Sequence, residues 1–189
     1  LGFKTIWDAY GRLFKAFVRT YVRDEGDLTK IRKLDEAIIY YNHAINIDLS
    51  FSLAHFNLSQ IMLLRKINHD GWKKYEYRDS KKNFRNKILQ NLKIVEWNKE
   101  DLTNKKLIIY SEQGIGDSVQ FLRYIKSINK KNTKIFLYTN KNLSYLFSNV
   151  VEIDSLVFED KNVPFCDFYI SLMSLPFIFK NLKQIPNAY

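Results

Sequence analysis

Apolar positions recur at helical spacing through the first part of the chain. Over residues 3–23 one face of the predicted helix collects aromatic side chains. The same period returns over residues 34–48, 54–64 and 70–78. We therefore predict a helical domain over residues 1–79, in which the aromatic face of the first segment packs against a neighbouring helix.

From Lys105 onwards the pattern changes to short apolar runs that alternate with helical segments. The predicted strands cover residues 107–110, 134–139, 156–158 and 168–170, and the predicted helices cover 118–129, 143–147 and 175–179. Alternation of this kind is typical of a mostly parallel sheet with right-handed crossovers. We expect a Rossmann-like α/β half-domain over residues 105–189, joined to the helical domain by a linker helix and loop at 80–104.

A glycine turn joins the first predicted strand to the helix that follows it. Gly114 and Gly116 interrupt the pattern, and helical spacing resumes at Val119. A strand, a glycine turn and a helix form the first half of a βαβ unit, where α/β proteins usually bind a ligand. Val119 replaces the third glycine of the dinucleotide fingerprint, and the Gly-Lys-Ser/Thr of a P-loop is absent, which excludes both loops. A turn without a ligand fits the loop alone equally well.

Charge and composition narrow the function only slightly. Hydrophobic residues make up 46% of the chain, and the net charge is +10. The positive charge favours anionic partners such as a nucleotide, a phosphate or a membrane surface. No apolar run approaches the roughly 20 residues of a membrane helix. We expect a cytoplasmic protein without a transmembrane segment, for which peripheral membrane contact stays open.

Metal and disulfide chemistry find little support in the sequence. Cys166 is the single cysteine, so an internal disulfide and a zinc site with several cysteines are excluded. The three histidines, His43, His55 and His69, lack the i, i+4 spacing of a helical metal pair. We expect no metal site and no cofactor.

Basic and apolar residues interleave over residues 80–100. This pattern has two interpretations, a nucleic-acid-binding surface or an amphipathic linker helix with a solvated basic face. No recognition motif accompanies the charge, so we favour the linker helix and expect no nucleic-acid partner.

Three pairs of similar residues lie 34 positions apart in the helical domain. They are Glu36 and Asp70, Ala37 and Gly71, and Tyr41 and Tyr75. This period is that of tetratricopeptide repeats, in which small residues let two helices approach closely. Leu49 stands where the proline after the second helix is usual. We expect one clean and one degenerate repeat, which rest on the α/β part or on further repeats upstream.

Four stretches fit a longer pattern. They are GWKKYEYR at 71–78, WNKEDLTNKKL at 97–107, SEQGIGDSVQFLRY at 111–124 and FCDFYISLMSLP at 165–176. In this order they resemble bacterial tetratricopeptide proteins fused to a domain similar to glycosyltransferase family 9, the lipopolysaccharide heptosyltransferases, and more distantly to O-linked N-acetylglucosamine transferases. The resemblance implies a GT-B fold, two Rossmann-like domains across a cleft. This chain would contain the N-terminal, acceptor-side domain, and the donor domain is missing.

The resemblance also implies roles for residues of the glycine loop. Gly116-Asp117 matches the Gly-Asp that supplies the catalytic base of heptosyltransferases. Inverting sugar transfer needs such a carboxylate to take the proton of the acceptor hydroxyl. The alternative for Asp117 is a helix cap without chemistry. The reserve base is Glu112, and Arg123 is either a phosphate contact or a surface residue; the substrate-binding candidates are Glu112, Gln113, Gly114, Gly116 and Gln120.

We therefore expect an inverting, metal-independent glycosyltransferase that transfers a sugar from a nucleotide-sugar donor to a glycan or protein acceptor bound through the repeats. The nucleotide sugar is a substrate and would be held mainly by the missing domain. For that reason we expect this chain alone to be an inactive fragment. The alternative is a non-catalytic tetratricopeptide scaffold for protein–protein interaction.

Overall fold

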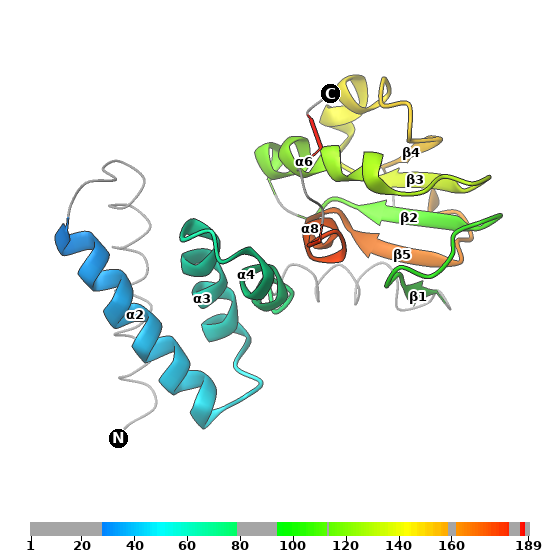
Figure 1. Cartoon of the computed structure of the whole chain (residues 1–189). Coiled ribbons are helices and arrows are strands. Elements are labelled where there is room, and N and C mark those ends of the chain that lie inside the picture. Colours follow the sequence, from blue (N-terminus) through cyan, green and yellow to red (C-terminus); the bar gives the residue numbers. More distant parts are fainter. Residues whose placement is uncertain (1–27, 79–93, 113, 159–161, 182–185, 188–189) are drawn as a thin grey trace.

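The computed structural model describes residues 28–78, 94–112, 114–158, 162–181 and 186–187. It places a row of helices beside a parallel sheet that carries further helices (Figure 1). The expected mixed α/β fold is therefore confirmed. Within these residues no helix is long and apolar enough to cross a bilayer. The predicted aromatic helix at 3–23 and most of the predicted linker helix lie outside the described residues.

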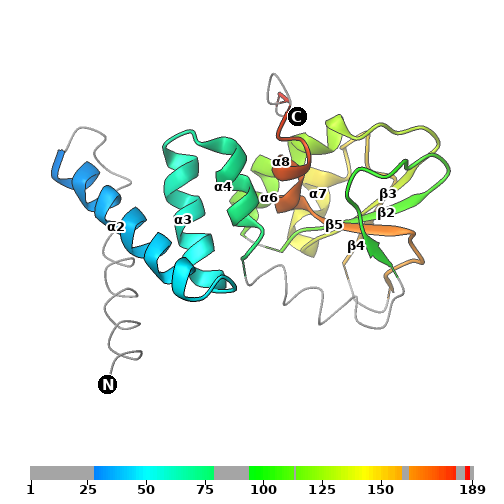
Figure 2. The ribbon, with the colours of Figure 1, turned by 60° about the horizontal axis from the view of Figure 1, so that its bottom comes forward.

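The helical part is a row of three successive helices. They are α2 (Leu28–Ile47), α3 (Ser52–Leu64) and α4 (Asn68–Tyr75). In both orientations α3 lies between α2 and α4 (Figures 1 and 2). The core between α2 and α3 contains Leu34, Tyr41 and Ile45 of α2 together with Ala54, Leu58 and Ile61 of α3. Tyr41 thus fills the space between two helices, as its place in the repeat pattern suggested.

Gly71 marks a close approach between α3 and α4. It is buried, and a Cβ atom added to it would lie 2.9 Å from both Cγ and Cδ2 of Leu63. Real Cβ atoms essentially never come this close to another carbon. Packing therefore favours a residue without a Cβ atom at this position.

The sheet has five strands, all parallel, in the order β1-β5-β2-β3-β4. The strands are β1 (Val95–Glu96), β2 (Lys106–Tyr110), β3 (Lys134–Tyr138), β4 (Ser155–Val157) and β5 (Phe168–Ser171). Four of them agree with the predicted strands to within two residues. The short β1 is a correction, since the sequence predicts a linker helix and loop over residues 80–104. Two residues are too few for a periodic pattern to show.

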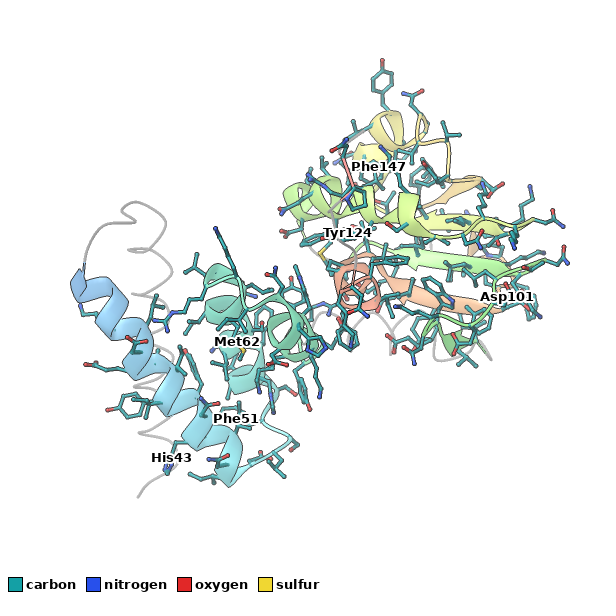
Figure 3. The ribbon with its side chains drawn as sticks, in the orientation of Figure 1. His43, Phe51, Met62, Asp101, Tyr124 and Phe147 are labelled. Atoms are coloured by element: carbon teal, nitrogen blue, oxygen red, sulfur yellow. The ribbon has the colours of Figure 1, made fainter. Side chains whose placement is uncertain are left out.

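Helices follow β2, β3 and β5. They are α6 (Ile115–Leu122), the 3-10 helix η2 (Arg123–Ser127), the 3-10 helix η3 (Lys141–Leu143), α7 (Ser144–Phe147), the 3-10 helix η5 (Leu172–Ser174) and α8 (Leu175–Ile178). The predicted helix at 118–129 thus begins earlier, at Ile115, and ends in a 3-10 turn. Tyr124 of η2 and Phe147 of α7, both labelled in Figure 3, are buried.

Alternate residues of β2, β3 and β5 contribute to two different cores. Leu107 and Ile109 of β2 belong to the large core that also contains Phe121 of α6 and Leu175 of α8. The intervening Ile108 and Tyr110 belong to a smaller core with Tyr169 and Cys166. Because both faces are buried, the strands appear in the sequence as continuous apolar runs rather than as alternating ones.

The helical row and the sheet share the large core. Tyr75 of α4 is one of its buried members, and Trp72 of α4 packs edge-on against Phe121 of α6, with ring centroids 5.7 Å apart. The two parts therefore form one packed unit and are not joined by the connecting chain alone.

The order of the strands locates the ligand-binding edge of such a sheet. From β2 the chain proceeds to β3 and β4 on one side, and it then returns to β5 on the other side of β2. In open parallel sheets, ligands bind outside the carboxyl ends of the two strands between which this reversal occurs. Here those strands are β2 and β5, and their carboxyl ends point towards the helical row (Figure 1).

Candidate functional site

The carboxyl ends of β2 and β5 meet at Tyr110 and Ser171, which are partners in the sheet register. The residues beyond them carry the candidate chemistry. Ser111 and Glu112 lead from β2 into the glycine loop and α6, while η5 follows β5 directly. This edge is where the sequence placed a ligand.

The side chain of Arg78 lies across this edge. Arg78 follows α4, and its side chain is 1% exposed. Its Nε donates to Oε1 of Glu112 at 2.5 Å, and its Nη2 donates to the hydroxyl groups of Ser171 at 3.0 Å and Ser174 at 2.9 Å. An arginine of the helical row thus contacts the residues after β2 and β5 at once.

The remaining nitrogen of Arg78 connects back to the helical row. Nη1 donates to the carbonyl oxygen of Tyr75 at 3.2 Å and to Oε1 of Glu76 at 3.0 Å. The other oxygen of Glu76 accepts a hydrogen bond from Ser174 at 2.9 Å. All three guanidinium nitrogens therefore have partners, and the cluster of Arg78, Glu76, Glu112, Ser171 and Ser174 joins three separate segments of the chain.

Glu112 is held through one of its two carboxylate oxygens. Besides Arg78, Oε1 accepts a hydrogen bond from Ser171 at 2.6 Å, and the side chain is 1% exposed. Its Oε2 is buried and has no hydrogen-bond partner among the described residues. Burial raises the pKa of Glu112, and the guanidinium of Arg78 and the hydroxyl of Ser171 only partly offset this effect. The carboxylate therefore faces the protein interior and is not presented to a substrate from solvent.

The charge of Arg78 is maintained by its neighbours. Burial alone lowers the pKa of a guanidinium, but the carboxylates of Glu112 and Glu76 outweigh burial and leave the pKa of Arg78 raised. Burial, and then the nearby Glu112 carboxylate, also raise the pKa of Tyr110, so this phenol stays neutral. The cluster is a buried cation between two carboxylates, beside a neutral phenol.

The glycine loop differs from the tight turn that its sequence suggested. Gly114 caps α6 at φ −62° and ψ 165°, and none of the described glycines has a positive φ. A Cβ atom at Gly116 would meet nothing within 4 Å, and one at Gly114 would meet only Oδ2 of Asp117, at 3.6 Å. Neither backbone conformation nor protein packing therefore requires glycine at these two positions.

Two serines connect the start of α6 to the end of β2. The hydroxyl groups of Ser118 and Ser111 are in hydrogen-bond contact. The Ser118 hydroxyl also donates to the carbonyl oxygen of Gly114 at 3.0 Å. Ser111 is itself tied to the sheet, because its amide donates to the carbonyl oxygen of Tyr138 at 2.9 Å. Both ends of the loop are thus anchored.

Asp117 lies between these anchors, in the first turn of α6. It is half-buried, and the described residues give its carboxylate no hydrogen bond and no ion pair. The cap position belongs to Gly114 rather than to Asp117. A carboxylate in the first turn of a helix is stabilised by the partial positive charge of the free backbone amides there. Its remaining lone pairs can accept a proton or a hydrogen bond from a bound molecule.

Only some of the other predicted site residues lie near Asp117. Gln120 is exposed on α6, one turn further along, and Gln113 lies outside the described residues. Arg123 donates from Nε to the carbonyl oxygen of Gln120 at 2.8 Å, so one of its nitrogens is bound to its own helix. The structure thus brings together Gly114, Gly116, Asp117 and Gln120 on the first two turns of α6, and it turns Glu112 away into the interior.

Sequence reasoning missed the residues that hold Glu112. Arg78, Glu76, Ser171 and Ser174 belong to no local motif, and they are 34 to 98 positions away from their partners in other segments. A signal was nevertheless present. Three of the four stretches that carry the family resemblance each contain members of this cluster.

His55 has a packing role in the helical row. His55 is 7% exposed, stacks on Tyr77 with ring centroids 3.9 Å apart, and contacts the carbonyl oxygen of Leu49 through Nε2 at 3.1 Å. Burial lowers the pKa of His55, so the ring is neutral at physiological pH. Over the described part of the chain, no group of three or more His, Cys, Asp and Glu side chains could hold a metal ion.

The site can therefore perform limited chemistry by itself. Asp117 can accept a proton, Gln120 can bind hydroxyl groups, and the open space at Gly116 admits a ligand close to the backbone. Comparison with protein-family models, with curated proteins and with solved structures gave no match for this chain.

Proposed function

We propose that this chain is the acceptor-side half of an inverting glycosyltransferase, preceded by tetratricopeptide-like repeats. The proposal takes its reaction class from the family resemblance of the glycine loop and the stretches around it. It is supported by the parallel sheet, in which the loop follows the central strand β2 at the carboxyl edge. Small residues at close helix contacts, such as Gly71 against Leu63, support the repeat assignment.

The observation that carries the proposal is that two carboxylates at this edge are paired with an arginine, while a third is not. Glu112 and Glu76 both bind Arg78. Asp117 is half-buried and has no partner among the described residues. A general base must be able to reach the hydroxyl whose proton it takes. Asp117 meets this requirement, so we assign the base to Asp117 and withdraw Glu112 as a reserve base.

The glycines of the loop add a second line of support. Glycine inside a helix destabilises it by roughly 0.5–1 kcal/mol relative to alanine. At Gly116 no neighbouring atom within 4 Å of an added Cβ compensates for this cost. A bound acceptor that approaches the backbone closely would explain why a side chain is absent there.

The substrates follow from the same assignment. The donor would be a nucleotide sugar, held mainly by a second Rossmann-like domain that faces this one, and the acceptor would be a glycan or protein. The net charge of +10 suits an anionic donor. The family resemblance implies a transfer that does not depend on a metal.

The test uses the longer protein that contains this chain together with a donor domain. Transfer from a panel of nucleotide sugars is measured for the unaltered protein, for Asp117→Asn, and for Asp101→Asn as a matched control. Asp101 lies at the far end of the sheet from α6 (Figure 3). We expect Asp117→Asn to abolish transfer with unchanged donor binding, and Asp101→Asn to leave transfer unchanged. Undiminished turnover by Asp117→Asn would remove it from the mechanism.

A non-catalytic scaffold is the second candidate, and one observation favours it. Arg78 lies across the edge between β2 and β5, where open α/β sheets bind their ligands. In a scaffold this edge would serve only to fix the repeats to the sheet. Failure of the longer protein to bind any nucleotide sugar would support the scaffold, whereas donor binding would support the enzyme.

A further inference from the structure

The cluster around Arg78 connects the helical row directly to the glycine loop. Arg78 is 34 positions from Glu112 and 93 from Ser171 along the chain, yet it is hydrogen-bonded to both. Glu112 stands two residues before Gly114, the cap of α6. The helical row is therefore attached at the point where the chain leaves β2 for the loop.

We propose that Arg78 is a positioning residue: by holding Glu112 it sets the path of the glycine loop, and with it the place of Asp117. The helical row is then a working part of the site and not a separate module that only recruits partners. Naming Asp117 as the group positioned rests on the proposed function. The coupling of Arg78 to the loop does not depend on the proposed function, and it can be measured in the absence of any enzymatic activity.

Over its described residues, the glycine loop has few packing constraints of its own. The protein leaves space free at Gly116, and at Gly114 a side chain would meet only Asp117. The loop must therefore be directed from its two ends. The contact between Ser118 and Ser111 ties the end of the loop to its start, and Glu112, next to Ser111, is held at the start because its Oε1 accepts from Arg78 and Ser171.

Arginine is needed for this arrangement. Its nitrogens donate in three directions, towards Glu112, towards the serines of η5 and β5, and towards the end of α4. The planar guanidinium presents these donors in a fixed fork, whereas a lysine ammonium is a point charge on a flexible stem. Arg78→Lys keeps the positive charge but removes the forked set of donors, so it separates the effect of the charge from that of the hydrogen-bond geometry.

Helix α4 fixes Arg78 in turn. Nη1 of Arg78 binds the carbonyl oxygen of Tyr75 in the last turn of α4, and the guanidinium carbon lies 5.0 Å from the centre of the Tyr75 ring. Tyr75 is itself buried in the core that α4 shares with the sheet. A displacement of α4 would move Arg78, then Glu112, then the loop.

The test measures amide hydrogen exchange in the 189-residue chain by NMR. Two reporters lie at the ends of the loop, the amides of Ser111, bonded to Tyr138, and of Ser118, bonded to Gly114. The amide of Ile135, bonded to Asp154, serves as a reference elsewhere in the sheet. In Arg78→Lys we expect exchange at least about tenfold faster at both reporters and unchanged exchange at Ile135, because the loop loosens without global unfolding.

Two further variants complete this test. Arg65→Lys is the matched control, since Arg65 forms an ion pair with Asp35 at 2.7 Å within the helical row, and it should leave both reporters unchanged. Glu112→Gln preserves the shape of the side chain and should accelerate exchange at both reporters, so the coupling can be tested even if Arg78→Lys fails to fold. Unchanged reporters in Glu112→Gln, or equal acceleration at Ile135, would overturn the proposal.

The outcome is independent of the proposed reaction. If the longer protein transferred no sugar from any nucleotide donor while Arg78→Lys accelerated loop exchange, the proposed function would fail and the coupling would stand. In an active longer protein we further expect Arg78→Lys to lower kcat at least about tenfold with unchanged donor Kd. Unchanged kcat would overturn the positioning role of Arg78.

Discussion

Arg78 and Glu112 form a buried ion pair, with Nη2 2.5 Å from Oε1 and each side chain only 1% exposed. Taking two charges out of water is unfavourable unless further hydrogen bonds satisfy them. Here the serines of β5 and η5 and the carboxylate of Glu76 supply those bonds. Removal of Arg78 therefore leaves Glu112 as an uncompensated buried charge, whereas removal of Glu112 leaves Arg78 paired with Glu76 alone.

We predict that Arg78→Met destabilises the chain strongly. Breaking a buried pair from one side typically lowers the free energy of unfolding by about 3–5 kcal/mol, and urea denaturation followed by circular dichroism measures this loss. Arg65→Met is the comparison, since the Arg65 and Asp35 side chains are 30% and 57% exposed. An exposed pair contributes about 0–1 kcal/mol. Equal losses in both variants would contradict the structural assignment of Arg78.

The sequence predicted those parts of the site that are formed by neighbouring residues, and it missed those formed by residues far apart in the chain. Strand β2, the glycine loop and α6 were predictable because their patterns are contiguous and periodic. Glu112 is a reserve base and a substrate-binding candidate in the sequence because it stands in the loop that carries the family resemblance. Its true partner, Arg78, comes from another segment, and periodicity carries no information about which distant side chains meet.

The carboxylate of Asp117 should matter little for stability. It is half-buried and has no partner among the described residues, so its neutral isostere removes only a helix-dipole interaction of about 0.3–1 kcal/mol. We predict that Asp117→Asn lowers the free energy of unfolding by no more than this, in the same urea titration. A loss of several kcal/mol would show that Asp117 is a structural residue, and it would undermine its assignment as a base.

Two glycine substitutions should have opposite effects on stability. Gly71→Ala places a Cβ atom 2.9 Å from Cγ of Leu63, so we expect a net loss of about 1–2 kcal/mol after the better helix propensity of alanine is included. Gly116→Ala meets open space, so we expect a gain of roughly 0.5–1 kcal/mol. Thermal unfolding of both variants tests this pair, and a stabilised Gly71→Ala would refute the close approach of α3 and α4.

Cys166 should react with thiol reagents only when the chain opens. It is 1% exposed, and burial raises the pKa of its thiol to about 11. The raised pKa alone lowers the thiolate fraction about a hundredfold relative to an ordinary cysteine. We predict that labelling by a disulfide reagent at pH 8 is slow in the native protein and fast in urea. Rapid native labelling would show that the smaller core of the sheet is open.

Asp154 should make stability depend on pH in the acid range. Its Oδ2 accepts the amide of Ile135 at 2.9 Å, and Lys130 and Lys134 lie within 3.1 Å of its carboxylate. Burial by itself raises the pKa of Asp154, but these partners outweigh burial and leave the pKa lowered. A carboxylate with a lowered folded pKa stabilises the fold above its unfolded pKa, and this stabilisation is lost as pH falls through the folded value.

Asp154→Asn should therefore be less stable than the unaltered chain at pH 7 by about 1 kcal/mol, after allowance for solvent screening. The difference should shrink as pH falls below 4, and shrink further towards pH 2, because the carboxylate of the folded chain becomes protonated in this range. Urea titrations at pH 7, 4 and 2 measure the difference. A difference that persists undiminished at pH 2 would mean that Asp154 acts through the shape of its hydrogen bond to Ile135 and not through its charge.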